Sequence, residues 1–263
     1  MATQVTLKPF TDDNGNVIET SLELENSRVV FRGKNNRLII DPKAKLERVI
    51  VNFDGDNAVV SIGASRYQSA WSLRAGQDST ISIGQDVSTT LMCTISAVEG
   101  TSVTIGNDVM LASENQIRAD DGHAIYDVRT SKRVNASRNI VIGNHVWLAY
   151  QACVLGGARI GDGTVVGFRS LVTSKLPNNV IAVGTPAKVV RRDIAWERPH
   201  LSLTAPAFRP DASVIKKTSK YWNHTIDAET RPVVRQKSLA RRIARKLGLA
   251  KVVRALRKRR SQN

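Results

Sequence analysis

The sequence predicts an all-β protein, a parallel β-helix of hexapeptide repeats, on three observations. Aliphatic residues recur every six positions from residue 142 to residue 172 without a slip. Small residues mostly occupy the position four places after each of them, and glycine often follows directly. The aliphatic series consists of Ile142, Leu148, Val154, Ile160, Val166 and Val172. An α-helix cannot use this period, because positions six apart lie on nearly opposite faces, whereas short strands joined by corners can.

Glycines mark the corners of the predicted β-helix. Gly143, Gly161 and Gly167 each follow an aliphatic residue of the series, and we expect a tight corner or a positive φ angle there. Residues two apart on a strand face the same way, so Val146 and Leu148 share one surface. Without the loop described below, about a hundred residues remain between residues 62 and 183, which is roughly six three-sided coils of about 18 residues each.

The hexapeptide frame is also present upstream, and a loop interrupts it. Ile105, Leu111 and Ile117 are again six residues apart. The next aliphatic position, Ile142, lies 25 residues beyond Ile117, which is not a multiple of six. Residues 124–139, which fall in this gap, are polar and carry several charges. We therefore expect them to form a loop extruded from one corner of the β-helix.

The remaining segments divide the chain further. Residues 1–27 show no frame and are predicted to be a loose lead-in, so the β-helix is expected over residues 28–192. Residues 193–230 contain several prolines together with tryptophan and tyrosine, and we expect an extended arm whose aromatic side chains pack on the body or on a neighbouring subunit. Residues 231–263 form a basic tail.

Composition gives expectations about the cellular compartment. The chain has no apolar run of about 18 residues, so no membrane-spanning helix is expected. Its first residues lack a basic region followed by an apolar one, so no secretory signal is expected. Cys93 and Cys153 lie inside strand patterns and are predicted to be small buried core residues. These features favour a cytoplasmic location.

Most of the positive charge lies in the tail. Of the formal net charge of +16, residues 231–260 contribute 13 Lys or Arg and no acid, which leaves +3 for the rest of the chain. From residue 238 to residue 247, apolar and basic residues fall on opposite sides at helical spacing. The apolar stripe resumes, rotated, after Gly248. Because glycine is a poor helix former, we expect two short amphipathic helices hinged there.

The tail favours docking on an anionic surface, such as the inner leaflet of a membrane. A polyanionic acceptor polymer is one alternative partner, and a solvated tail without a partner is another. Nucleic acid is not an expected partner, because the body is nearly neutral and the tail has no aromatic residue for base stacking.

Four stretches carry a resemblance to a known family. They are IGNDVML (105–111), DGHAIYD (121–127), IGNHVW (142–147) and LPNNVIAVGTPAKVV (176–190). From about residue 29 to residue 196 the chain resembles the left-handed β-helix hexapeptide acyltransferases, most of all the capsular polysaccharide O-acetyltransferases of the polysialic-acid type. The resemblance implies the left-handed sense, acetyl-CoA as co-substrate, and a homotrimer with its sites between subunits.

The resemblance also implies a reaction. It is the transfer of acetyl from acetyl-CoA to a hydroxyl of a bacterial capsular or other surface polysaccharide. Maltose-type relatives hold their sugar with an asparagine that is missing from the equivalent stretch TTLMCTI (Thr89–Ile95), which favours a different acceptor, such as a polymer. The alternatives are a small-molecule acceptor (an antibiotic or a nucleotide sugar) and a non-catalytic β-helix scaffold.

His123 is the candidate catalytic residue. O-acetylation needs a base that removes the proton of the acceptor hydroxyl, and neutral histidine suits that role near physiological pH. His123 lies where a strand position meets the predicted loop, within the stretch that matches the family's catalytic segment. Asp121 and Asp127 are candidates to orient its ring, and a solvated loop position is the alternative for either.

Trp147 is the candidate for the substrate and acetyl-CoA groove. A tryptophan is too large for a prism filled with small residues, so we expect it to point outward. The resemblance implies that it lies beside the histidine of the adjoining subunit. A role in trimer contact alone is the alternative. His145, two residues earlier, is expected at the surface or at an interface.

Three further residues are candidates for binding acetyl-CoA. By motif position, the backbone amides of Ala149 and Gly167 are predicted to contact the pantetheine arm, and Lys188 the phosphate. No metal site is predicted, because a carbonic-anhydrase-like β-helix needs three clustered histidines and only His123 and His145 lie within the predicted helix.

Overall fold

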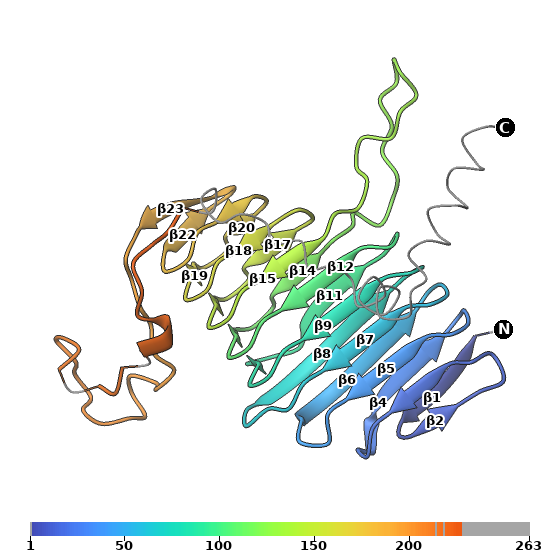
Figure 1. Cartoon of the computed structure of the whole chain (residues 1–263), viewed down its shortest axis with the longest axis horizontal. Coiled ribbons are helices and arrows are strands. Elements are labelled where there is room, and N and C mark those ends of the chain that lie inside the picture. Colours follow the sequence, from blue (N-terminus) through green and yellow to red (C-terminus); the bar gives the residue numbers. More distant parts are fainter. Residues whose placement is uncertain (1, 214, 218, 228–263) are drawn as a thin grey trace, which may run out of the picture. The chain divides into compact units, whose positions relative to one another are not determined.

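The computed structural model describes residues 2–213, 215–217 and 219–227, and these residues form a β-helix followed by an arm (Figure 1). Its strands lie in three sheets, which we call A, B and C. From β8 onward each coil runs through sheet A, then sheet B, then sheet C. The prediction of a parallel β-helix is therefore confirmed.

The strands of the three sheets are as follows. Sheet A contains β1 (Thr3–Leu7), β4 (Leu24–Phe31), β6 (Lys45–Phe53), β8 (Gln68–Ala75), β11 (Cys93–Ala97), β14 (Gln116–Arg118), β17 (Cys153–Leu155) and β20 (Leu171–Val172). Sheet B contains β2 (Phe10–Thr11), β3 (Val17–Glu19), β5 (Arg37–Ile40), β7 (Val59–Ile62), β9 (Thr80–Ile83), β12 (Ser102–Ile105), β15 (Ile140–Ile142), β18 (Arg159–Ile160) and β21 (Lys175–Leu176). Sheet C contains β10 (Ser88–Thr89), β13 (Met110–Leu111), β16 (Trp147–Leu148), β19 (Val165–Val166), β22 (Ile181–Gly184) and β23 (Ala187–Arg191).

The early coils are longer than hexapeptide coils. Val29 pairs with Val51 and Val51 with Leu73, 22 residues apart in each case. In the later coils Val154 pairs with Val172 and Ile142 with Ile160, at a spacing of 18. The hexapeptide period therefore holds strictly only in the later coils, where the sequence signal is strongest.

The longer coils enclose a wider interior. Trp71 on β8 is fully buried, and the rings of Phe31 and Phe53 stack inside with centroids 5.1 Å apart. The argument that a tryptophan is too large for the interior is therefore wrong for these coils. Trp147 does point outward, but the reason is alternation along its strand: its neighbours Val146 and Leu148 are fully buried.

The two cysteines differ in their surroundings. Cys93 is fully buried, and burial raises the pKa of its thiol to about 12. Cys153 is only partly buried, because it alternates with the inward residues Ala152 and Val154 on its strand. The prediction of a core position is confirmed for Cys93 and wrong for Cys153.

The β-helix begins earlier than the sequence predicts. β1 pairs antiparallel with β4, and β2 forms an antiparallel pair with β3, which is itself parallel to β5. Most of residues 1–27 thus closes the first coil. These strands lack the hexapeptide period because they run against or outside the regular winding, so no frame was visible in the sequence.

The corner glycines allow close approach between coils. A Cβ atom on Gly143 would lie 2.3 Å from Oδ1 of Asp162, so only glycine fits there. The positive φ angle falls two residues later, at His145 (51°) and Gly163 (69°). Asn144 belongs to a ladder at this corner: its Oδ1 accepts the backbone N–H of residue 107 at 2.9 Å, and its own N–H donates to Asp162 at 2.8 Å.

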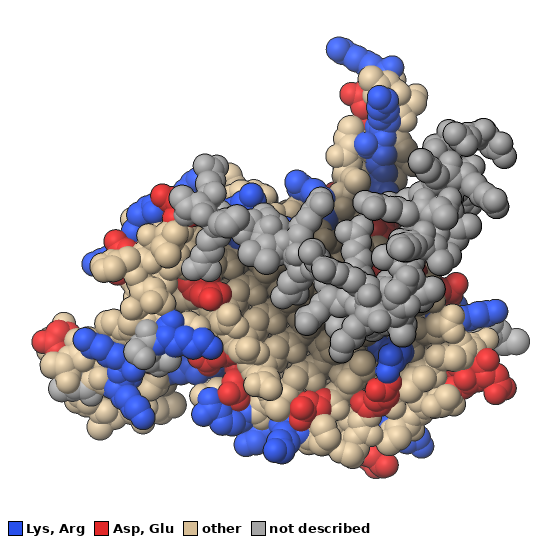
Figure 2. Space-filling model, in the orientation of Figure 1, with Lys and Arg blue, Asp and Glu red and all other residues tan. Residues whose placement is uncertain are grey.

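A loop leaves the β-helix between β14 and β15, as predicted. Residues 124–139 lie within it, and an antiparallel bridge joins Tyr126 to Arg133. Figure 1 shows the loop projecting away from the coils, and Figure 2 shows lysine and arginine side chains gathered along it. The loop leaves at the corner between sheets A and B.

The arm follows β23 and contains the short 3-10 helix η1 (Ser219–Tyr221). No helix in the described ranges is long and apolar enough to cross a membrane. The predicted amphipathic helices of the tail, residues 231–263, lie outside the described residues.

Candidate active site

The two main candidate residues lie on opposite parts of the β-helix. His123 is in the loop that leaves the corner between sheets A and B, whereas Trp147 is on β16 in sheet C. In a three-sided coil, the third side lies opposite the corner formed by the other two. One chain therefore does not bring His123 and Trp147 together.

His123 lies at the base of the loop with its side chain exposed. Its backbone carbonyl accepts a hydrogen bond from Nδ2 of Asn135 at 2.8 Å, and the same amide nitrogen donates to Asp121 at 3.0 Å. Among the described residues, the imidazole has no hydrogen-bond partner. The ring is thus free to meet a substrate, while its backbone is fixed.

Neither candidate acid orients the His123 ring within this chain. Asp121 accepts from Asn135, as described above. The carboxylate of Asp127 accepts the backbone N–H groups of Thr130 at 2.8 Å and Arg129 at 2.9 Å, and these bonds hold the pKa of Asp127 below its ordinary value. Asp127 therefore fixes the turn at the loop's tip.

The loop is anchored to the preceding coil by Glu99. Arg133 forms an ion pair with Glu99, and Oγ of Ser137 donates to the same carboxylate at 2.6 Å. The bond from Arg133 and then that from Ser137 lower the pKa of Glu99 to about 2. A second anchor is the buried carboxylate of Asp120, which accepts from the Ser96 hydroxyl.

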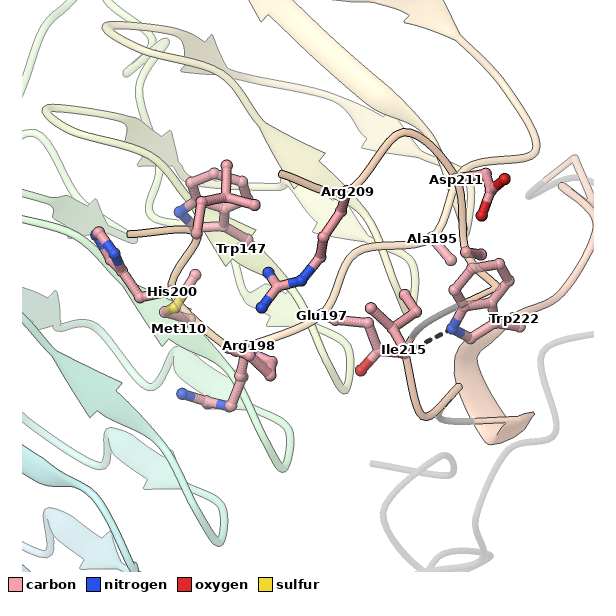
Figure 3. A pocket seen from close by; sticks show the side chains of 13 residues that line it. Met110, Trp147, Ala195, Glu197, Arg198, His200, Arg209, Asp211, Ile215 and Trp222 are labelled. Carbon is pink, nitrogen blue, oxygen red and sulfur yellow. Dashed lines mark hydrogen bonds between the residues drawn. The ribbon is translucent and has the colours of Figure 1, made fainter. Parts of the chain in front are cut away.

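Trp147 forms part of a cavity of about 570 Å³ (Figure 3). Met110 on the adjacent strand β13 and Trp147 form its inner wall, and the other lining residues belong to the arm. In the arm, Nε1 of Trp222 donates to Glu197 at 2.7 Å. Arg209 also lines the cavity, and its buried Nε has no hydrogen-bond partner among the described residues.

The arm packs on the body, one of the two options predicted for it, and it covers His145. The imidazole is stacked between the rings of Trp196, with centroids 4.0 Å apart, and Tyr221, at 4.4 Å. Its Nδ1 lies 2.6 Å from Asp108, and its Nε2 lies 2.9 Å from the carbonyl oxygen of Trp196. His145 does point out of the β-helix, but the prediction of a surface position is wrong because the arm buries it.

The sequence contained one signal for this contact. The motifs IGNDV and IGNHV place Asp108 and His145 at the same corner of consecutive coils, with the loop between them in sequence. Their proximity could thus have been derived from the hexapeptide frame. Trp196 and Tyr221 gave no such signal, because the arm has no repeat.

The predicted acetyl-CoA residues lie in the last coils. The N–H of Ala149 donates to the carbonyl of Val166 at 2.9 Å, and that of Gly167 to Ala182 at 2.8 Å. Both donors are used between coils, so neither amide is free to donate to pantetheine. Lys188 on β23 is exposed. Within the described residues, no three His, Cys, Asp or Glu side chains form a group that could hold a metal ion.

Comparison with curated proteins shows extended similarity to one relative. The chain is 31% identical over 184 residues to a polysialic acid O-acetyltransferase of Neisseria meningitidis, covering 70% of this chain and 85% of the relative. It is 35% identical over 97 residues to a polysialic acid O-acetyltransferase of Escherichia coli O1:K1, but this covers only 32% of that protein. A galactoside O-acetyltransferase of E. coli K12 is 35% identical over 113 residues, 54% of its length. The chain thus spans between a third and about half of these two relatives.

Two solved structures are similar as well. The polySia-specific acetyltransferase NeuO has a TM-score of 0.65 and 34% identity, covering 70% of this chain and 86% of that one. The polysialic acid O-acetyltransferase OatWY has a TM-score of 0.52 and 28% identity, covering 68% and 94%. No family model matches the chain. The coverage and identity of these relatives, on the same left-handed β-helix, show that this chain belongs to the hexapeptide-repeat O-acetyltransferase family that includes the polysialic acid O-acetyltransferases.

Proposed function

We propose that this protein transfers acetyl from acetyl-CoA to a hydroxyl group of a bacterial capsular or other surface polysaccharide. Family membership supports the acetyl transfer, and the relatives' polysialic acid supports a glycan polymer as acceptor. The observation on which the proposal rests most is the placement of His123. Its exposed imidazole has no hydrogen-bond partner within the described part of the chain, and Glu99 and Asn135 hold the base of its loop in place.

In the proposed reaction, His123 acts as general base. Acetyl-CoA supplies the acetyl group as a thioester. His123 accepts the proton of the acceptor hydroxyl while that oxygen bonds to the acetyl carbon; the carbon–sulfur bond breaks, and the proton passes to the leaving thiolate. Direct attack is favoured over an acyl-enzyme, because no motif in the sequence supports a nucleophilic serine or cysteine. Burial also raises the pKa of the Cys93 thiol to about 12, which disfavours its thiolate.

The proposed site is shared between subunits of a homotrimer. His123 and Trp147 lie on opposite parts of one chain, so a site containing both needs the loop of one subunit and sheet C of the next. Three equivalent contacts of this kind close a ring.

The hydrogen bonds between coils limit which atoms of the predicted residues can contact acetyl-CoA. The N–H groups of Ala149 and Gly167 are occupied, and the Ala149 carbonyl already accepts from the Ala152 N–H at 3.1 Å and from Asn115 Nδ2 at 2.8 Å, so pantetheine would pack against this main chain and the neighbouring side chains. Lys188, exposed on β23, fits a phosphate group of the cofactor. The cavity beside Trp147 fits the glycan, because its two indoles offer flat apolar surfaces and Arg209 lies in its wall.

A subunit-mixing experiment tests the shared site. His123→Ala and Trp147→Ala subunits are each expected to form nearly inactive trimers. When the two are denatured and refolded together at equal amounts, about a quarter of the sites receive an intact histidine from one subunit and an intact tryptophan from the next. Acetyl transfer to polysialic acid should therefore recover to about a quarter of the wild-type rate.

The control mixes wild-type with His123→Ala subunits, where about half of the sites stay intact. If the refolded mixture of the two single variants were no more active than the sum of its components, both residues would belong to one chain's site or to none. The shared-site model would then be rejected.

For the tail we propose docking on the inner face of the membrane, with the enzyme in the cytoplasm. The proposal rests on sequence alone: 13 basic residues and no acid between residues 231 and 260. The full chain is expected to float with vesicles containing anionic lipid at low salt. A chain ending at Thr230 is expected to remain in the unbound bottom fraction. Neutral vesicles serve as the control, and equal recovery of both proteins with anionic vesicles would reject the proposal.

A further inference from the structure

The arm that walls the Trp147 cavity is fastened to the β-helix at one corner. There Trp196 and Tyr221 enclose His145, and Nε1 of Trp196 donates to the His145 carbonyl at 2.9 Å. Trp196 also lies against Trp147, with ring centroids 6.0 Å apart. Trp196 therefore both attaches the arm to the β-helix and packs against one side of Trp147.

Arg198 supplies the densest set of bonds at this corner. Its Nε donates to Asp108, its Nη1 to Ser88 Oγ at 2.9 Å, and its Nη2 to the carbonyls of Asp86 and Val109, both at 3.0 Å. Four of its five N–H groups are thus used. The guanidinium also lies over the ring of Tyr67, 4.3 Å from its centroid. These partners come from three successive coils.

Charge reinforces the attachment. Burial raises the pKa of Asp108, but hydrogen bonds from His145 and Arg198 outweigh that effect and leave the pKa below its ordinary value. Asp108 is therefore ionised at neutral pH and bonds both side chains at once. The side chain of Arg198 is only 14% exposed, so this ion pair is poorly screened by solvent.

We propose that Arg198 is a positioning residue for the acceptor: it acts through the arm, keeping the Trp147 cavity formed, and contacts no substrate itself. The proposal rests on the proposed function. Arg198 is among the residues that line the cavity, but four of its five N–H groups are bonded to the β-helix, which argues against a main role in binding substrate directly. None of the candidate acetyl-CoA residues Ala149, Gly167 and Lys188 lines the cavity. We therefore expect the arm to affect binding of the glycan and not binding of acetyl-CoA.

Replacing Arg198 should therefore separate two kinetic constants. In Arg198→Ala, the KM for polysialic acid oligomers is expected to rise about tenfold or more, while kcat at saturation stays within about threefold and the KM for acetyl-CoA is unchanged. Arg198→Lys should show most of the same rise, because a compact ammonium group cannot bond four acceptors and stack on Tyr67 together. Arg48→Ala, an exposed arginine on β6, is the matched control and should behave as wild type.

A second readout needs no substrate. The backbone N–H of Ile194 donates to the carbonyl of Asn179, and amide hydrogen exchange over residues 194–198 should become faster in both Arg198 variants if the arm loosens. Trimer size and circular dichroism verify that each variant is folded, and Arg198→Lys is the milder variant if alanine is not tolerated.

The outcomes separate the two proposals. Faster exchange together with the selective rise in acceptor KM supports the positioning role. Unchanged exchange, an unchanged acceptor KM or a fall confined to kcat overturns it. If the wild-type enzyme acetylates no glycan, the proposed function fails, and the positioning role for its acceptor fails with it; hydrogen exchange would still establish whether Arg198 fastens the arm.

Discussion

Replacing His123 with alanine is expected to lower kcat for acetyl transfer by about 10²- to 10⁴-fold, the usual contribution of a general base. The alanine variant cannot accept the hydroxyl proton, so the acceptor oxygen attacks the thioester as a poor, neutral nucleophile. Trimer formation and acetyl-CoA affinity should be retained. His123 makes no side-chain hydrogen bond among the described residues, and Asn135 holds the loop base through the backbone carbonyl.

The measurement is thiol release from acetyl-CoA in the presence of polysialic acid, compared with equilibrium binding of acetyl-CoA to the same preparation. His224→Ala is the matched control, because His224 is also exposed but lies in the arm, where its side chain is 3.4 Å from Asp193 and its carbonyl accepts from Asn178 at 3.0 Å. Wild-type turnover in the His123 variant would remove the residue from the mechanism. Equal losses in both variants would point to a general effect of removing a histidine.

Replacing Trp71 with alanine is expected to lower the free energy of unfolding by about 3–5 kcal/mol. Trp71 is fully buried, and its Nε1 donates to Ser69 Oγ at 2.9 Å. The space cannot collapse easily, because β8 is hydrogen-bonded to β6 on one side and β11 on the other, which fixes the distance between coils. The cost of the cavity is therefore added to the lost burial.

Denaturant unfolding at a fixed subunit concentration measures this change, since the stability of an oligomer depends on concentration. Trp147→Ala is the matched control. It removes the same side chain from the outside of the same fold and should change the free energy by no more than about 1 kcal/mol. If the two variants lost equal stability, the wide early interior would not be the source of the effect.

The sequence predicted the β-helix best in the coils whose residue spacing is regular. In coils of 18 residues, Val154 and Val172 pair in register. Because each stacked strand has the same environment as the one before it, the same type of residue recurs at a fixed spacing in the sequence. The coils of 22 residues have longer strands, since β8 spans Gln68–Ala75 whereas β17 spans Cys153–Leu155, and this blurred the hexapeptide frame before Ile105. The loop was predictable because it broke a strict period.

Some parts of the candidate site could likewise be predicted from the sequence, and others could not. His123 and Trp147 could be named from motifs, and the outward position of Trp147 follows from strand alternation. The attachment of the arm could not be derived, because it joins Arg198 to residues such as Ser88 that are 110 positions away, without a repeat to relate them. The amides of Ala149 and Gly167 were proposed from motif position, and only the coil-to-coil hydrogen bonds reveal that both N–H groups are already used.

The strands that close the β-helix have a consequence for solubility. A stack of parallel coils presents unpaired backbone groups at each end, and a second molecule could extend it in register, as chains add to a cross-β fibril. β1 at one end and β23 at the other run antiparallel to the strands beside them. A further coil wound in the same direction would lie antiparallel to either strand, so at these two edges it could not repeat the parallel pairing that joins one coil to the next. At these two edges the reversed strands thus interrupt the parallel stacking on which in-register filament growth depends.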